Sequence, residues 1–163
     1  MITRRFMLLG GSAGVAVGAL ALRGAPARAA QPYPLTLTDV QWKGRLTPDA
    51  YVVLRKAGTE EPFTSPLLKE HRPGVFNCAG CQLDLFSSKT KFESGTGWPS
   101  FWAPITKTAV EIKQDYSFNM ERQAVNCTRC GGHLGHVFND GPKPTGLRYC
   151  MNGVALGFKP GPV

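Results

Sequence analysis

The sequence lacks three features, and each absence excludes a class of protein. It has no internal repeat or low-complexity tract, and beyond residue 29 no apolar run approaches the roughly 20 residues of a membrane-spanning helix. It also lacks a strong excess of charge in its main part. The first 29 residues hold four of the 19 basic residues and none of the 11 acidic ones, so 15 basic and 11 acidic residues remain, a net charge of +4. This balance is ordinary for a soluble domain, and we expect no nucleic-acid partner.

The first 29 residues have the pattern of an export signal. Residues 3–6 read TRRF, a loose match to a twin-arginine signal, and a mildly apolar stretch follows. Residues 27–29 read ARA, the small-x-small pattern of a cleavage site. An uncleaved N-terminal anchor is the alternative, but the stretch is short and diluted by glycine. We predict a cleavable signal over residues 1–29, a periplasmic protein exported by the twin-arginine route, and no stable membrane association after cleavage.

The rest of the chain is long enough for one domain with its own core. Residues 30–45 are predicted to be a leader, extended up to Thr38, and residues 46–160 a single domain. A helix is expected within residues 46–58, because Thr47 can cap it, Pro48 suits its first turn and Gly58 suits its end. A second, shorter helix is expected at residues 65–71, where Ser-Pro has the same two roles.

From Gly74 onward the sequence consists of short runs rich in Val, Phe, Ile and Tyr, separated by turn-forming residues. No long segment with helical periodicity lies between these runs, which favours antiparallel strands over βαβ units. The predicted fold class is therefore mainly β, with short helices on the N-terminal side. Seven segments are expected to be strands: residues 74–78, 90–94, 109–113, 124–127, 136–138, 147–152 and 154–158.

Four of the five cysteines form two CxxC pairs, and we predict that they bind one structural Zn²⁺: Cys78, Cys81, Cys127 and Cys130. A CxxC turn directs two thiolates at one ion, and two such turns complete the tetrahedral shell that zinc prefers. Two disulfides are an alternative in an exported protein. A thioredoxin-like redox site is another, although its βαβ setting is absent from the sequence pattern. No organic cofactor is expected.

Cys150 is the fifth cysteine and has no partner at CxxC spacing. If residues 147–152 form a strand, Arg148, Cys150 and Asn152 share one face while Tyr149 and Met151 face the core. The alternative is an inert buried thiol that packs as a small hydrophobe. A neighbouring guanidinium argues against this, because positive charge favours the nucleophilic thiolate.

Two of the three histidines lie close behind the second cysteine pair. His136 and Phe138 share a face of an extended strand, and a bulge at Gly135 would bring His133 to the same face. Zinc ligation is a weak alternative because four thiolates already close the metal site, and exposure at the surface is another. A thiol with a histidine beside it fits nucleophilic catalysis assisted by an acid or base.

A glycine-rich segment, SGTGWPSFW at residues 94–102, carries Trp98 before a proline. The indole could belong to the core or could form the apolar wall of a small-ligand pocket. Periodicity does not decide between the two.

These segments together resemble the B-type methionine sulfoxide reductases, which reduce the R epimer of methionine sulfoxide. The stretches that carry the resemblance are GTEEPFTS, CAGC, SGTGWPSFW, CTRCGGHLGHVFNDGPKPTGLRYCMNG and ALGF. The resemblance as a whole extends from about residue 46 to 158. The resemblance implies a β-tent-like fold of two small antiparallel sheets braced by zinc. It also implies oxidised methionine in proteins or peptides as the substrate, and a monomer.

The resemblance assigns roles to the candidate residues. Cys150 matches the nucleophile that attacks the sulfoxide sulfur and becomes a sulfenic acid. His136 matches the residue that protonates the sulfoxide oxygen, and His133 and Asn152 match residues that position it. The remaining matches are Arg148 to the arginine that supports the thiolate, Trp98 with Phe138 to the substrate-binding residues, and the four CxxC cysteines to the zinc ligands.

One position departs from the family pattern. Many members have a cysteine where this chain has Thr96, and that cysteine resolves the sulfenic acid as a disulfide. We therefore expect an external thiol or a thioredoxin-like partner to reduce Cys150. Two other functions stay open on the sequence alone: a zinc-ribbon binding module without catalysis, and a thiol-disulfide oxidoreductase that uses one CxxC pair.

Overall fold

The computed structural model describes residues 33–163, so the predicted export signal lies outside the described residues. Its helices are α1 (Asp39–Arg45), α2 (Pro48–Lys56) and the 3₁₀ turns η1 (Pro66–Lys69), η2 (Ser88–Thr90), η3 (Ser117–Asn119) and η4 (Gly153–Ala155). Its strands are β1 (Gly74–Cys78), β2 (Asp84–Ser87), β3 (Lys91–Phe92), β4 (Ser100–Phe101), β5 (Val110–Asp115), β6 (Arg122–Cys127), β7 (His133–Phe138), β8 (Arg148–Met151) and β9 (Leu156–Pro160). Among residues 33–163, no helix is long and apolar enough to cross a membrane.

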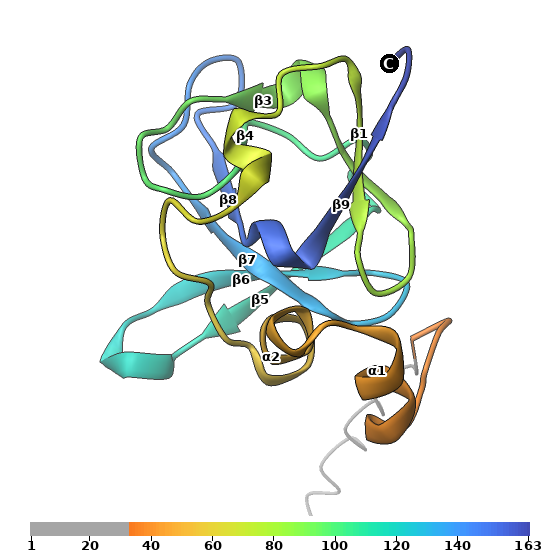
Figure 1. Cartoon of the computed structure of the whole chain (residues 1–163). Coiled ribbons are helices and arrows are strands. Elements are labelled where there is room, and N and C mark those ends of the chain that lie inside the picture. The colour runs from red at the N-terminus through yellow and green to blue at the C-terminus, as the bar shows by residue number, and fades with distance from the viewer. Residues whose placement is uncertain (1–32) are drawn as a thin grey trace, which may run out of the picture. The chain divides into compact units, whose positions relative to one another are not determined.

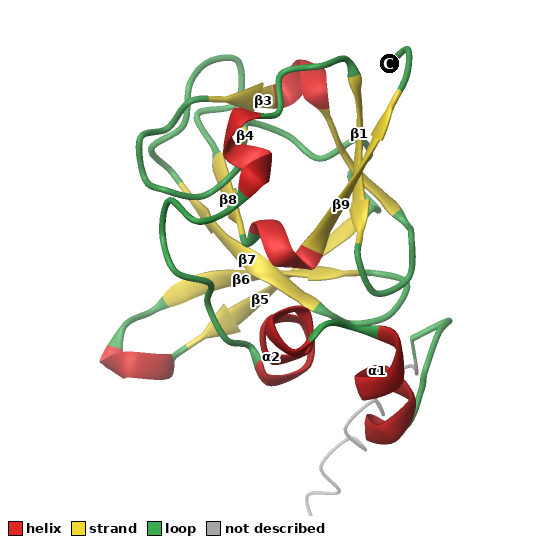
Figure 2. Ribbon diagram, viewed as in Figure 1, coloured by secondary structure: helices red, strands yellow, loops and turns green. Residues whose placement is uncertain are grey.

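The strands form two antiparallel sheets, as predicted (Figures 1 and 2). The smaller sheet has the order β2-β1-β9, and the larger has the order β3-β4-β8-β7-β6-β5. Helix α2 packs against β7 (Figure 1). The mainly β class with short N-terminal helices is confirmed.

Aromatic side chains from both sheets form the core between them. Phe76 of β1 and Phe86 of β2 are fully buried against Phe101 of β4, with ring centroids 4.9 and 4.4 Å apart. Pairs at this separation add to the free energy of burial by about 0.5–1.5 kcal/mol each. This core fixes β4 and β8, which carry the candidate site, against the smaller sheet.

The sequence prediction missed α1, β2 and β4. Helix α1 lies within the predicted leader and begins with a capping box, in which Thr38 and Gln41 bond to each other's backbone N–H groups. It buries Trp42 in the core. The two missed strands are too short for an alternating pattern to be recognised, since β4 has only two residues.

The predicted helix at residues 46–58 is present as α2, with the Thr47 side chain accepting a hydrogen bond from Ala50 N. It ends one residue earlier than Gly58 implied, because Ala57 adopts the left-handed conformation at its C-terminus. The second predicted helix is the 3₁₀ turn η1, capped by Ser65. Residues 154–158 are divided between η4 and β9, so the last predicted strand begins later than expected.

Candidate active site and metal centre

The four CxxC cysteines meet at one point between the sheets. Their Sγ atoms all lie within 4.8 Å of one another, with Cys78 and Cys130 3.7 Å apart and Cys81 and Cys127 3.4 Å apart. A tetrahedral ion with Zn–S bonds of about 2.3 Å would separate its sulfur ligands by about 3.8 Å. The donor set and its geometry therefore fit a tetrahedral thiolate-bound metal ion.

The two cysteine turns have the same backbone design. Each begins at the last residue of a strand, and in each the residue after the second cysteine has a left-handed conformation: Gln82 at φ 63° and Gly131 at φ 68°. Each of these residues donates its N–H to the carbonyl of the first cysteine, at 2.8 Å in both turns. The sequence reading recognised the glycine but not Gln82, because only glycine takes this conformation without cost.

The N-terminal helices cover the cysteine cluster. Arg55 of α2 donates to the carbonyl of Cys130 at 3.0 Å, and Arg129 donates to that of Cys81 at 3.1 Å. All four cysteines are buried. Hydrogen bonds from Cys127 lower the pKa of Cys81 and raise that of Cys78.

Cys150 lies apart from this cluster, in the middle of the larger sheet. On β8 it is directly opposite Ser100 of β4 and His136 of β7. Directly opposed residues of antiparallel strands project their side chains to the same face, about 5 Å apart. The strand register alone therefore places a thiol beside an imidazole, and Cys150 is partly accessible to solvent.

The expected bulge in β7 is present. Val125 pairs with Gly135 while the next residue, Asn126, pairs with His133, so one additional residue lies in β7. The bulge brings His133 and His136 to one face, with ring centroids 5.2 Å apart. Gly135 is required because a Cβ there would overlap the carbonyl oxygen of Cys150.

The two histidines have different environments. His133 is 6% exposed, and burial lowers its pKa to about 4, with the neighbouring His136 as a second cause. Its imidazole is therefore neutral at pH 7. The Nε2 atom of His136 lies 2.7 Å from Oδ2 of Asp115 on β5.

Arg148 lies two residues before Cys150 on the same face. It donates two hydrogen bonds to Asp140, at 2.9 and 2.8 Å, and its guanidinium lies 4.5 Å from the ring centroid of Phe138. The bond to Asp140 raises the pKa of Arg148, and the charge of Cys150 contributes to the same shift. The guanidinium is thus held in place near the thiol.

Asn152 does not share the face of Cys150 in the way the strand prediction implied, because β8 ends at Met151. Its buried side chain donates to the carbonyl of Leu134 at 3.0 Å and accepts from Glu60 N at 2.9 Å. Leu134 lies in the β7 bulge between the histidines, so Asn152 acts on them through the backbone.

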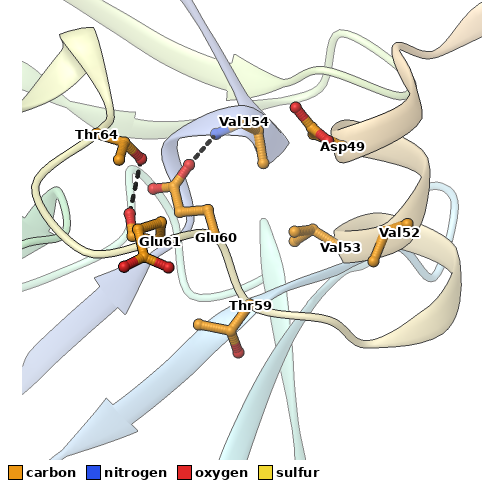
Figure 3. A pocket seen from close by; sticks show the side chains of 8 residues that line it. All are labelled: Asp49, Val52, Val53, Thr59, Glu60, Glu61, Thr64 and Val154. Carbon is orange, nitrogen blue, oxygen red and sulfur yellow. Dashed lines mark hydrogen bonds between the residues drawn. The ribbon is translucent and has the colours of Figure 1, made fainter.

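Glu60 connects these segments, and the sequence reading gave it no role. Its carboxylate accepts hydrogen bonds from Gly153 N at 2.5 Å and Val154 N at 2.9 Å, and its carbonyl accepts from Trp98 Nε1 at 3.2 Å. Figure 3 shows the carboxylate directed at Val154, while the neighbouring Glu61 points away. One buried residue thus fixes both the indole and the turn that follows Cys150.

Trp98 is half-buried and borders a cavity of about 310 Å³ that Ser94 and Ser100 also line. This arrangement favours the pocket-wall interpretation of the indole over the core. The loop after it is joined to β8, because Met151 N donates to Pro99 O at 2.9 Å.

Hydroxyl groups surround Cys150 on the side of this loop. Thr96 Oγ1 lies 3.7 Å from Cys150 Sγ. Ser94 Oγ lies 2.9 Å from that threonine hydroxyl and 2.7 Å from Ser100 Oγ. Thr96 thus places a hydroxyl in contact with Cys150.

The structure therefore brings Cys150, His133, His136, Arg148 and Phe138 to one face of the larger sheet, with Trp98 in the adjoining loop and Asn152 behind the β7 bulge. The sequence reading missed Glu60, Asp115 and Asp140. Asp140 falls within the quoted HVFNDGP stretch and Glu60 within GTEEPFTS, so motif membership was a signal for both. Asp115 had no such signal, because its role depends on strand order.

Comparison with known proteins identifies the same family that the sequence motifs resemble. The SelR domain family matches residues 46–160. "Peptide methionine sulfoxide reductase MsrB" of Leptospira interrogans is 52% identical over 127 residues, covering 78% of this chain and 97% of the relative. Proteins of the same name from Methanosarcina barkeri and Thioalkalivibrio sulfidiphilus are 56% and 50% identical, covering 75% and 79% of this chain and 86% and 94% of the relatives. The chain belongs to the MsrB family of methionine sulfoxide reductases, which are oxidoreductases.

Proposed function

We propose that this protein reduces the R epimer of methionine sulfoxide in peptides or proteins, with Cys150 as the nucleophile and His136 as the acid. The observation that carries the proposal is the register of β7 and β8, which sets these two residues directly opposite each other on one face. The family relation supports the reaction class.

The chemistry needs a nucleophile and a proton at neighbouring points. The thiolate of Cys150 attacks the sulfoxide sulfur while His136 protonates the oxygen, which would otherwise be a poor leaving group. The oxygen passes to Cys150, leaving methionine and a cysteine sulfenic acid. Substrate sulfur gains two electrons, and the cysteine sulfur loses two.

Epimer selection would come from fixed groups around the sulfoxide. A sulfoxide sulfur carries a methyl group, an oxygen and the side-chain carbon, so a site that fixes the methyl group and the oxygen while Cys150 attacks the sulfur from one side selects one epimer. We assign the methyl group to the Trp98 indole, held by its hydrogen bond to Glu60. We assign the oxygen to His136.

Regeneration of Cys150 would use an external reductant. The other four thiols of the described chain are buried together in the cysteine cluster, and Thr96 contacts Cys150 where relatives have a resolving cysteine. Two external thiols, or one dithiol such as a thioredoxin-like protein, would reduce the sulfenic acid to thiol and water and become a disulfide. Mass spectrometry after one turnover without reductant should find Cys150 as sulfenic acid. An intramolecular disulfide at Cys150 would contradict this route.

We propose that the cysteine cluster holds one structural Zn²⁺. Its four buried thiolates would supply the whole tetrahedral shell, which leaves no open position for substrate. The ion would join β1 and β6, two strands distant in sequence, and so contribute to folding. Metal analysis of the purified protein should give one zinc ion per chain.

We further propose that the protein is exported to the periplasm as a monomer, after cleavage near residue 29. Sequencing of the N-terminus of the protein recovered from the periplasm tests the signal. A full-length N-terminus would favour the membrane anchor instead.

Resolved R and S epimers of methionine sulfoxide, assayed with dithiothreitol as reductant, test the activity itself. We expect turnover of the R epimer alone in protein that carries its metal. Reduction of the S epimer instead, or of neither, would refute the proposed function.

A further inference from the structure

Asp115 lies on β5, the edge strand of the larger sheet, whereas Cys150 lies on β8. Asp115 nevertheless contacts His136 of β7. The distance between His136 Nε2 and Asp115 Oδ2 is 2.7 Å, and the two side chains are only 12% and 21% exposed. This bond crosses β6, the strand between them.

The sequence of β6 makes the crossing possible. Ala124 of β6 pairs with His136 on one side and with Lys113 of β5 on the other, so these residues form one row across the sheet. Asp115 is two residues from Lys113 and shares its face. Because Ala124 has only a methyl group, the imidazole can extend over it and reach the next row on β5.

The charges around Asp115 determine which atom carries the proton. Hydrogen bonds from His136 and from Ser117 hold the pKa of Asp115 well below its usual value, and Arg122 donates to the same Oδ2 atom at 2.8 Å. An ionised carboxylate only accepts hydrogen bonds, so Nε2 of His136 must be the donor. The other ring nitrogen, Nδ1, is then the one available to substrate, and it can donate a proton only when the ring is the imidazolium, with both nitrogens protonated.

We propose that Asp115 is the positioning residue for His136, holding the ring by its Nε2–H so that Nδ1–H of the imidazolium is presented to the substrate oxygen. The inference rests on the proposed role of His136 as the acid. The arrangement links three strands: Cys150 on β8 lies beside His136 on β7, and His136 is bonded to Asp115 on β5. The thiol and the imidazole are set by the β7–β8 register, and the imidazole is oriented from β5.

The decisive comparison is Asp115→Asn against Glu111→Gln. Glu111 lies on the same face of the same strand, and its carboxylate pairs with Lys113 and Tyr33 instead of His136. We expect Asp115→Asn to lower kcat for the R epimer by about 10- to 100-fold with little change in KM, because a misplaced acid affects the chemical step. Glu111→Gln should retain wild-type kcat. Asp115→Glu, which keeps the carboxylate, should recover part of the loss.

A second variant interrupts the path while leaving both residues in place. Ala124→Val puts a branched side chain under the imidazole, and we expect the same loss in kcat. The rate of Cys150 alkylation by iodoacetamide should be unchanged in both variants, since Asp115 acts on the acid and not on the thiol. Wild-type kcat in Asp115→Asn would overturn the inference, whatever the effect of Ala124→Val.

Proton NMR of the wild-type protein supplies a test that does not depend on a variant folding. A hydrogen bond to a carboxylate should give His136 Nε2–H a downfield signal protected from exchange, and absence of that signal would overturn the inference. Wild-type protein that reduces neither epimer would refute the proposed function without affecting this signal. If the wild-type protein reduces the R epimer and the Asp115→Asn variant has the same kcat, only the role of Asp115 is refuted.

Discussion

Replacement of Glu60 by glutamine should destabilise the protein more than any other single isosteric change near the site. The carboxylate is buried and accepts two backbone N–H groups, at 2.5 and 2.9 Å, from the turn that follows Cys150. Glutamine keeps the volume and one oxygen but places an NH₂ group against a backbone donor. One charged hydrogen bond is lost and the other becomes neutral.

Hydrogen bonds to a charged group contribute about 1.5–3 kcal/mol each, and an unsatisfied buried donor costs about 1–3 kcal/mol. The expected decrease in the free energy of unfolding is therefore about 2–4 kcal/mol, which corresponds to a fall in melting temperature of roughly 10 °C for a domain of this size. Urea unfolding, followed by fluorescence in zinc-loaded, reduced protein, measures it. The midpoint should fall while the slope stays constant.

Glu61→Gln is the matched control. Glu61 is adjacent and exposed, and its backbone carbonyl, which accepts from Thr64 Oγ1 at 2.7 Å, is unaffected by the substitution. We expect it to stay within about 0.5 kcal/mol of wild type, as surface substitutions usually do. If Glu60→Gln were as stable as Glu61→Gln, the carboxylate would not stabilise this turn and the reasoning would be wrong.

Three further predictions concern the thiols and His133. Cys150→Ser should reduce turnover of the R epimer at least about 10³-fold while one zinc ion per chain is retained; loss of zinc would place Cys150 among the ligands. Cys78→Ser should lose the zinc and unfold at a lower temperature, whereas retention of one zinc ion at wild-type stability would exclude the four-thiol site. Because burial lowers the pKa of His133 to about 4 from 6.5, the unfolded chain takes up this proton first as pH falls. The difference in unfolding free energy between wild type and His133→Gln should therefore shrink by about 2 kcal/mol from pH 7 to pH 5, and a constant difference would show that His133 is not buried as a neutral group.

The cysteine cluster and the separate position of Cys150 were predictable because their signals are local. A CxxC turn requires only four residues to direct two thiols, so Cys78, Cys81, Cys127 and Cys130 could be paired without knowledge of the fold. Cys150 could be distinguished from these four because it has no partner at CxxC spacing. The period of two along a strand then placed Arg148 on its face and Tyr149 on the core face, as the structure has them.

The same rule failed at Asn152 because it assumed that the strand continued. The chain leaves β8 at Met151, and the amide turns to the backbone of Leu134 and Glu60. Nothing within a few residues of Asn152 specifies that turn. It depends on Glu60, 92 residues earlier in the chain, whose backbone N–H donates to the Asn152 side chain and whose carboxylate accepts from Gly153 and Val154.

The sequence by itself determined the family, the β class, the grouping of four cysteines and the separate position of the fifth, because each is encoded by residue types at short spacing. Only the tertiary structure decided which residues support them. Glu60 reaches Gly153 and Trp98, and Asp115 reaches His136, across long intervals of sequence. These contacts depend on strand order and on the small side chain of Ala124 between two strands, and neither follows from local pattern. A lone cysteine in the sequence thus lies, in the folded chain, beside His136, whose imidazole reaches Asp115 two strands away.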